Sequence, residues 1–586
     1  MQDPLRQKNI ALGNGPVKLI AINSRYIHSC LALFYLRNCL EQNGVCRDPE
    51  IFQATINDNY YETLLRIGSG KPRVVFFSAN IWNSGRIERL VRDLHRSLVN
   101  CVFIIGGPQA VVLRSKLADS VCTVVIGEIE VVPEEFYEDL ARGKLKPLYR
   151  PAPGRKRIKQ LAFPFRDDDF RDHLKNRYIY YETSRGCPHG CSYCQSASEK
   201  GLFHKDREQV EQELTRLLHY KPKVVRFVDR TFNDLPERSL GIWQFLAAQK
   251  SETLFHFEIA PDRFTEEMFT FLEGVESGRF QFEIGIQTTH DKTLQAINRS
   301  MDLHHVHDII ARLVSLETIH LHVDLILGLP YETGETFADS FRHVFAMGAH
   351  YVQMGLLKIL PNTPLSEQVG EFGYKYCEAP PYSVLENKWL THAEMSELYW
   401  FCECVEKFHN NRYFVSLWAY LRKVDEDIYL FFNELLGVCR GEMFFERAPT
   451  QAFLTDLLMV YCKDRDDYET VADLLRYDWL RCGFRKLPPS LVVGAGEEGS
   501  DETRNILYSG LPENLNGVFT SRERNNFFKK SVFLQLKDNT CKILGIECCG
   551  TGRRIGVLTE REESLYRHNK VVVLPDIVAN IGVCEQ

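Results

Sequence analysis

The feature that most limits the fold is the alternation of short apolar runs with helical patterns over the first 145 residues. The helical patterns are amphipathic, as at 83–98, where Ile87, Leu90, Val91, Leu94 and Leu98 share one side. The apolar runs are nearly continuous and β-branched, as expected of parallel strands buried on both faces. They are VKLIAI (17–22), EIFQA (50–54), VVFFS (74–78), CVFII (101–105) and CTVVI (122–126). Five β/α units predict a doubly wound, Rossmann-like α/β domain at residues 15–147.

A second alternating region follows a basic, proline-containing segment at 146–172, which we interpret as a linker. Helical patterns again separate the runs, as at 206–219. Strand candidates begin near residues 178, 223, 254, 280, 319 and 351. Six β/α units predict a partial (β/α)6 barrel at 173–370. In such barrels the chemistry lies at the carboxyl ends of the strands.

The remaining segment, 371–586, is predicted to be a mainly helical C-terminal region of unassigned role. Helical patterns dominate from 390 to 485, and strand-like runs occur at 531–548 and 570–574. The sequence VVGAGEEG (492–499) matches G-x-G-x-x-G, the loop that cradles a dinucleotide. Its two glutamates would repel phosphate, so we do not expect a dinucleotide there.

Composition excludes several classes of partner. The net charge is −7 and the pI about 6.3, so no nucleic-acid partner is expected. No apolar run reaches the roughly 18 residues that span a bilayer, and no secretory signal is evident. These features predict a cytoplasmic protein with no membrane partner. Disulfides are rare in that compartment, so the 18 cysteines need another explanation. Fifteen are scattered, mostly in apolar stretches, and behave as small hydrophobic residues.

The other three cysteines form a compact cluster in YETSRGCPHGCSYCQSASEKG (181–201). Cys187, Cys191 and Cys194 have the spacing C-x3-C-x2-C. Thiolates select zinc, copper(I) or iron–sulfur clusters. A closed zinc site needs four ligands, and no fourth Cys or His stands at zinc-finger spacing, although His189 lies within the loop. Three cysteines on a cubane leave one iron open, so the segment predicts a 4Fe–4S cluster. A zinc knuckle and chance clustering remain alternatives.

This segment, with the aromatic Tyr193 before the third cysteine, resembles the signature of radical S-adenosylmethionine (SAM) enzymes. The resemblance implies that the open iron binds SAM, whose reduction yields methionine and a 5′-deoxyadenosyl radical. It also implies that Tyr193 contacts the cofactors.

The later strands resemble the SAM-binding strands of oxygen-independent coproporphyrinogen oxidases. FHFEIAP carries Glu258, FEIGIQTTHDKTLQAINR carries Gln287 and Arg299, and HVDLILGLPYET carries Asp324. The resemblance implies that these four residues hold the ribose and methionine ends of SAM, with an arginine clamping the carboxylate. The usual Gly-Gly-Glu is replaced by RFVDRTFND, so Asp229 is expected to contact the SAM amino group.

The first domain resembles the cobalamin-binding domain of cobalamin-dependent radical SAM enzymes. The matching residues follow predicted strands: Ser78, Gly106 and Gly107 of IIGGP, and Gly127 of VIGEIE. The resemblance implies cobalamin at these strand ends, with its nucleotide tail against the glycines. The cobalt-ligating Asp-x-His-x-x-Gly is absent, and NSRYIHSC offers only His28, which implies that no protein histidine binds cobalt. A flavodoxin-like domain without ligand is the alternative.

The fragments PPYSVLENKWLTHAEMSEL (380–398) and FHNNRYF (408–414) resemble the C-terminal extension of an uncharacterised branch of this family. The family implies methylation of an unactivated carbon of an unknown substrate through a 5′-deoxyadenosyl radical, with an electron donor such as flavodoxin or ferredoxin. Rearrangement or cyclisation without methyl transfer is one alternative. A non-catalytic cobalamin or cluster sensor and a zinc-stabilised interaction protein are the others.

Overall fold

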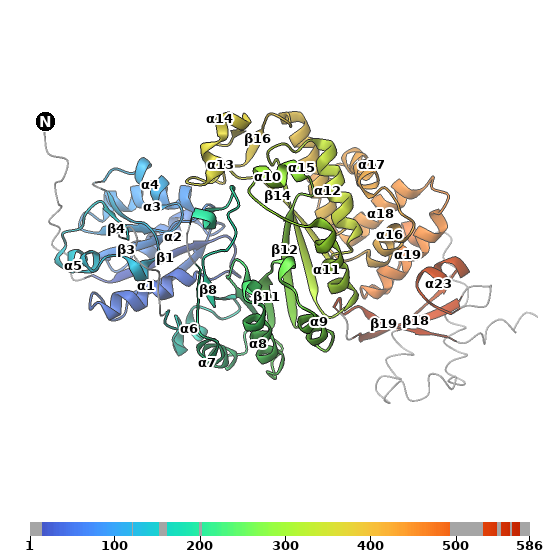
Figure 1. Cartoon of the computed structure of the whole chain (residues 1–586), viewed down its shortest axis with the longest axis horizontal. Coiled ribbons are helices and arrows are strands. Elements are labelled where there is room, and N and C mark those ends of the chain that lie inside the picture. Colours follow the sequence, from blue (N-terminus) through green and yellow to red (C-terminus); the bar gives the residue numbers. More distant parts are fainter. Residues whose placement is uncertain are drawn as a thin grey trace, which may run out of the picture.

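The computed structural model describes residues 15–119, 121–151, 161–198, 202–492, 531–547, 553–562 and 565–574. Two parallel α/β sheets lie side by side, and a helical region with a small antiparallel sheet follows them (Figure 1). The predicted fold class is therefore confirmed. The exact domain boundaries stay predictions.

The first sheet has six parallel strands in the order β2-β1-β3-β4-β5-β6. They are β1 (Val17–Asn23), β2 (Glu50–Thr55), β3 (Val74–Ser78), β4 (Val102–Gly106), β5 (Cys122–Val125) and β6 (Leu148–Tyr149). The helices are α1 (Leu31–Gln42), α2 (Tyr60–Gly68), α3 (Ser84–Ser97), α4 (Ala110–Lys116) and α5 (Glu134–Arg142). Separate apolar clusters cover the two faces of the sheet, which explains why its strands read as continuous apolar runs.

The segment predicted as a linker is more ordered than expected. It contributes β6 to the first sheet and the helix α6 (Asp167–Asp172). Asp169 forms a buried ion pair at 2.6 Å with Arg37 of α1, 132 residues earlier. Because this partner is so distant in sequence, local composition could not reveal that the segment packs on the first domain.

The second sheet is a partial barrel of six parallel strands in the order β14-β13-β12-β11-β10-β7. They are β7 (Ile179–Tyr181), β10 (Val224–Phe227), β11 (Leu254–Glu258), β12 (Phe280–Gln287), β13 (His320–Leu327) and β14 (Tyr351–Leu356). The helices of this region are α7 (Arg207–Leu218), α8 (Pro236–Ala247), α9 (Glu266–Glu273), α10 (Asp291–Ala296), α11 (Leu303–Ser315) and α12 (Gly334–Ala346). A short antiparallel pair, β8 (Ser184–Arg185) and β9 (Phe203–His204), follows β7. The predicted strand order along the chain is thus confirmed.

The C-terminal region closes one edge of this barrel. Its helices are α15 (His392–Phe408), α16 (Val415–Lys423), α17 (Ile428–Gly441), α18 (Gln451–Cys462) and α19 (Tyr468–Arg481). Asn410 pairs with the edge strand β14 as a further strand would: its amide accepts from the Val352 N–H at 2.9 Å and donates to the Val352 carbonyl at 2.8 Å. The FHNNRYF fragment therefore caps an edge that would otherwise be open to pairing.

A small antiparallel sheet, in the order β17-β18-β19, ends the described chain. Its strands are β17 (Val532–Leu536), β18 (Arg553–Arg561) and β19 (Asn569–Val573). The strand predicted over 531–548 is wrong beyond Leu536, because α23 (Asp538–Ile543) follows. Asp473 of α19 anchors the start of that helix by accepting from the Lys537 N–H and the Thr540 hydroxyl.

The G-x-G-x-x-G segment lies outside the described residues. Among the described helices, none is long and apolar enough to cross a membrane.

Candidate functional site

The cysteine loop begins at the carboxyl end of the first barrel strand. Gly186, at φ 107°, turns the chain out of β8 into the loop. The Ser192 N–H donates to the Ile297 carbonyl at 2.9 Å, and the Asn298 amide donates to the Gly190 carbonyl at 2.8 Å. A Cβ at Gly190 would lie 2.8 Å from the same Asn298 nitrogen, so a larger residue there would disturb this hydrogen bond.

The three thiols meet different neighbours in this loop. Cys191 is buried, whereas Cys187 and Cys194 are partly exposed. Arg299 Nη1 lies 3.6 Å from the Cys191 sulfur, and the Thr231 hydroxyl lies 3.9 Å from that of Cys187. Burial raises the pKa of Cys187, and the thiols of Cys194 and Cys191 raise it further.

The donor set suits a 4Fe–4S cluster, because three thiolates converge on one loop without a fourth ligand. Among the described residues, no group of three or more His, Cys, Asp or Glu side chains is already spaced as a metal site.

Glu258 on β11 and Asp324 on β13 lie on either side of β12 and face a region rich in carboxylates. Burial raises the pKa of Glu258 to about 7, and Arg230, at 3.5 Å, opposes this increase. The pKa of Asp324 is raised well above its usual range by burial and by the nearby Glu283 and Glu258. One Asp324 oxygen is buried and has no hydrogen-bond partner among the described residues. An orphaned buried acceptor is costly unless a ligand supplies a donor.

Gln287 and Arg299 meet above β12, next to Asp324. Gln287 has φ 74° at a bulge in the β12–β13 pairing, where Gly285 lies opposite Asp324. A Cβ at Gly285 would lie 2.1 Å from the Gln287 amide nitrogen, so any larger residue there would displace the Gln287 side chain. Arg299 donates to the Gly285 carbonyl, while its Nε is buried without a partner. The structure thus brings Gln287, Arg299, Asp324 and Cys191 together.

Tyr193 lies beside the same group. Burial raises the pKa of its phenol, with Cys191 adding to the effect and Arg299 opposing it. The structure therefore places Tyr193 next to the buried cysteine.

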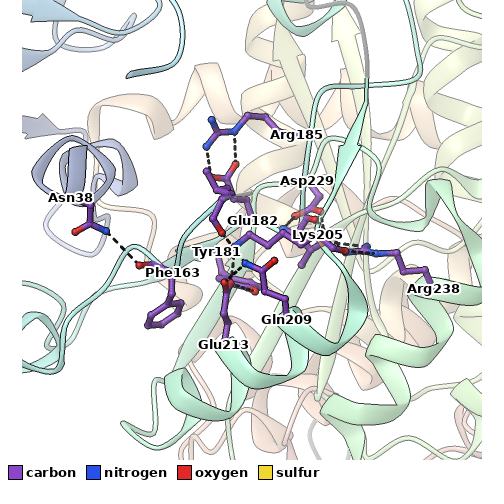
Figure 2. Close-up of polar contacts among 12 residues, drawn as sticks. Asn38, Phe163, Tyr181, Glu182, Arg185, Lys205, Gln209, Glu213, Asp229 and Arg238 are labelled. Atoms are coloured by element: carbon purple, nitrogen blue, oxygen red, sulfur yellow. Dashed lines mark hydrogen bonds and ion pairs between the residues drawn. The ribbon is translucent and has the colours of Figure 1, made fainter. Parts of the chain in front are cut away.

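Asp229 has a different environment from the one expected. It is 1% exposed and accepts hydrogen bonds from the Thr183 N–H at 2.9 Å, the Thr183 hydroxyl at 2.5 Å and the Ser184 hydroxyl at 2.6 Å (Figure 2). Arg238 donates to the Thr183 hydroxyl and carbonyl from the other side. These bonds engage both oxygens of the carboxylate and hold the turn that precedes the cysteine loop. The expected contact of Asp229 with SAM stays a prediction.

A second buried group, which sequence reasoning missed, supports β7, the strand that precedes this turn. Lys205 is fully buried and pairs with Glu213 at 2.7 Å (Figure 2). Glu213 also accepts from the Tyr181 hydroxyl at 2.6 Å and from the Gln209 amide at 2.7 Å. The helical pattern at 206–219 contained the only signal, a glutamate on its apolar side.

The first sheet carries a cavity of about 230 Å3 at the carboxyl ends of its strands. All four residues proposed from sequence for cobalamin line it: Ser78, Gly106, Gly107 and Gly127. Gly107, at φ 97°, is required by the turn itself, since its Cβ would lie 2.6 Å from the Ala79 carbonyl. Gly106 has room instead, because its Cβ would find its nearest neighbour at 3.9 Å.

Arg185 links this cavity to the cysteine loop. It lines the cavity and stands two residues before Cys187. Its guanidinium pairs with Glu182 at 2.5 Å, with Glu130 at 3.1 Å and with Glu128 at 3.5 Å. Figure 2 shows the pair with Glu182. Sequence reasoning missed Arg185, although it directly precedes Gly186.

His28 does not line the cavity. Its Nδ1 lies 2.6 Å from the Tyr180 hydroxyl of the barrel strand β7. Burial, and then Arg226, lower its pKa. His28 therefore joins the first domain to the barrel.

Comparison with known proteins agrees with this geometry. Residues 181–344 match the Radical SAM superfamily. The chain contains a radical SAM domain. Residues 370–540 match a protein family of unknown function, DUF4080. This range includes both C-terminal fragments singled out above.

The radical SAM domain and its surroundings resemble two curated methyltransferases. One is the 2-(S-pantetheinyl)-carbapenam-3-carboxylate methyltransferase of Streptantibioticus cattleyicolor, 27% identical over 51% of this chain and 46% of the relative. The other is the cobalamin-dependent radical SAM methyltransferase TokK of Streptomyces tokunonensis, 26% identical over 42% of this chain and 40% of the relative. The chain thus spans less than half the length of these curated relatives.

Solved structures share the fold. The cobalamin-dependent SAM radical enzyme OxsB matches with a TM-score of 0.55 and 12% identity, over 84% of this chain and 82% of OxsB. The radical SAM methyltransferase TsrM from Kitasatospora setae matches with a TM-score of 0.50 and 17% identity, over 63% of this chain and 80% of TsrM.

Proposed function

We propose that the protein is a cobalamin-dependent radical SAM enzyme that methylates an unactivated carbon of its substrate. One observation carries the proposal: the four residues expected to contact cobalamin line one cavity, and Arg185 connects that cavity to the cysteine loop. The two methyltransferase relatives favour methyl transfer over rearrangement or cyclisation.

We assign Cys187, Cys191 and Cys194 to the 4Fe–4S cluster. Bound together, the cluster, SAM and cobalamin would supply radical formation and a transferable methyl group. The Nε of Arg299 is buried with no partner among the described residues, and its Nη1 lies 3.6 Å from the Cys191 sulfur, so the guanidinium can donate to the SAM carboxylate. Gln287 and Tyr193 would flank SAM. Asp229 would act only by positioning the loop.

Glu258 and Asp324 would accept hydrogen bonds from SAM. Because burial raises the pKa of Glu258 to about 7, this carboxyl group is only partly ionised at neutral pH. A cationic ligand such as SAM stabilises the ionised form, so its binding should release protons from this pair. The orphaned Asp324 oxygen is the acceptor that such a ligand would satisfy.

The cavity of the first domain would hold part of cobalamin against Ser78, Gly106, Gly107 and Gly127. Glu128, Glu130 and Arg185 would give it a polar end. We further propose that no protein histidine binds cobalt, because His28 is engaged with Tyr180 and does not line the cavity.

Radical SAM chemistry requires a reductant and a substrate. We propose flavodoxin or ferredoxin as the electron donor, and the cytoplasm as the location, because an oxygen-sensitive cluster needs a reducing compartment. No nucleic-acid or membrane partner is proposed.

The test is an anaerobic assay of the reconstituted full chain. We expect iron and sulfide in cubane ratio, SAM-dependent formation of 5′-deoxyadenosine, and a product heavier than its substrate by one CH2. A product of unchanged mass would favour rearrangement or cyclisation. Retained cofactors without any SAM cleavage would favour a sensor, and zinc in place of iron would contradict the proposal.

A further inference from the structure

At the amino ends of β13 and β14, away from the cysteine loop, five polar side chains meet. They come from three parts of the chain: two from the amino ends of the barrel strands, two from α16 and the turn before it, and one from the segment between β18 and β19. We call them the donor cluster: His320, His350, Arg412, Arg422 and Tyr566. Arg412 lies over the Tyr566 ring at 5.8 Å, and the rings of His320 and His350 are 5.2 Å apart. The Tyr566 and His350 rings are 5.8 Å apart.

The two arginines lack the anionic partner that a covered guanidinium normally has. Within the part of the chain that the structure describes, Arg422 forms no ion pair and no side-chain hydrogen bond. Its guanidinium carbon lies over the Phe345 ring, 5.2 Å from the ring centroid. Arg412 likewise forms no ion pair there and donates only to His320 Nδ1, at 3.3 Å. Burial lowers the pKa of both side chains, so each charge is costly where it lies.

The histidines add donors instead of acceptors. His320 Nδ1 accepts from Arg412 and His350 Nδ1 accepts from the Leu321 N–H at 3.1 Å, so each neutral ring carries its proton on Nε2. His320 is 4% exposed, and its Nε2 is buried with no partner in the described part of the chain. The pKa of His350 is lowered to about 4, chiefly by burial and then by Arg412 and Arg422, which keeps the ring neutral.

Carboxylates near the cluster do not neutralise it. Glu317, in the turn before β13, raises the pKa of Tyr566, but in the described part of the chain it forms no ion pair with either arginine. Glu406 is engaged by the Tyr351 hydroxyl at 2.9 Å and by the Asn410 amide at 2.6 Å. Two guanidiniums, two ring N–H groups and a phenol thus lie together with no acceptor of matching charge among the residues that the structure describes.

We propose that the donor cluster binds an oxyanion, namely a phosphate or carboxylate group. Such a group has several acceptor oxygens and suits the planar fork of arginine. The ligand would join the barrel, the helical region and the final sheet, and would therefore stabilise their packing. This site is independent of the proposed methyl transfer.

The test is thermal unfolding of the full-length, anaerobically purified protein, titrated with inorganic phosphate or with succinate at constant ionic strength. Keeping the ionic strength constant with chloride removes general screening effects. We expect a saturable rise of the Tm with at least one of the two anions, because the ligand binds only the folded state. Which anion is effective identifies the phosphate or the carboxylate as the group recognised.

Two variants and a control complete the design. Arg412→Met and Arg422→Met should lose the response, and Arg422→Met should not lower the Tm in anion-free buffer, since it removes an uncompensated charge. Arg342→Met is the control: Arg342 pairs with Asp427 at 2.9 Å on the surface and should leave the response intact. A wild-type Tm that responds to neither anion, or an unchanged response in Arg422→Met, would overturn the proposal.

Discussion

Replacing Arg185 with alanine is the perturbation whose effect follows most directly from the structure. The side chain is 17% exposed, as is Glu128, while Glu130 is 16% and Glu182 is 7% exposed. Alanine would leave three covered carboxylates without their shared cation. Removing one partner of a buried ion pair costs about 3–5 kcal/mol, whereas fully exposed pairs contribute about 0–1 kcal/mol. Because these groups keep some contact with water, we expect a loss of about 2–3 kcal/mol.

The assay is equilibrium unfolding in urea, monitored through the transition in which the first domain and the barrel unfold. Arg185→Lys should lose less than alanine, because it keeps the charge but not the forked geometry. Arg171→Ala is the matched control, since Arg171 is 69% exposed and pairs with surface carboxylates. It should cost less than about 1 kcal/mol. A loss in Arg185→Ala no larger than that of the control would refute the reasoning.

Three further predictions concern the cysteine loop and its neighbours. Arg299→Ala should weaken SAM binding about tenfold or more, since a charged hydrogen bond contributes roughly 1.5–3 kcal/mol; unchanged affinity by calorimetry with an intact cluster would count against the clamp. SAM affinity should rise between about pH 6 and pH 8, as Glu258, with a pKa of about 7, ionises, and Glu258→Gln should flatten the profile; equal slopes in both proteins would exclude Glu258. Asp229→Asn should change the electron paramagnetic resonance spectrum or the reduction potential of the cluster and leave SAM affinity nearly unchanged, whereas a loss of SAM affinity with an unchanged cluster would restore a direct SAM contact.

Much of the fold could be predicted because parallel strands buried on both faces give a simple pattern in the sequence, a nearly continuous apolar run. The runs at 74–78 and 122–126 correspond to β3 and β5 within a residue, since burial on both faces admits few polar side chains. The cysteine loop could be predicted equally well, because the spacing of its cysteines is a local pattern. Helix α23 could not be predicted, because the contacts at its start come from the distant Asp473.

What the sequence did not reveal depends on partners far apart in the chain. Arg185 lies 55 residues from Glu130, and Asn410 lies 58 residues from Val352. The hydrogen bonds of Asp229 were hidden for the same reason: its carboxylate accepts from Thr183 and Ser184, about 45 residues earlier, and no local motif indicates that. Local patterns identify elements and loops, whereas these contacts depend on how the elements pack.

The central claim is that the cavity at the carboxyl ends of the first sheet binds cobalamin without a histidine ligand. Cobalamin retained after desalting, in the chain reconstituted with hydroxocobalamin, measures this directly. Gly106→Phe should fill the cavity and abolish retention without disturbing the turn, since a Cβ there is unhindered. Gly85→Phe, on the exposed side of α3, is the matched control and should retain the cofactor.

The electron paramagnetic resonance spectrum of the reduced, cobalt(II) form completes this measurement. The account predicts retained cobalamin whose spectrum shows no nitrogen splitting from the protein and is unchanged in His28→Ala. Nitrogen splitting that disappears in His28→Ala, or a wild-type chain that retains no cobalamin, would contradict it.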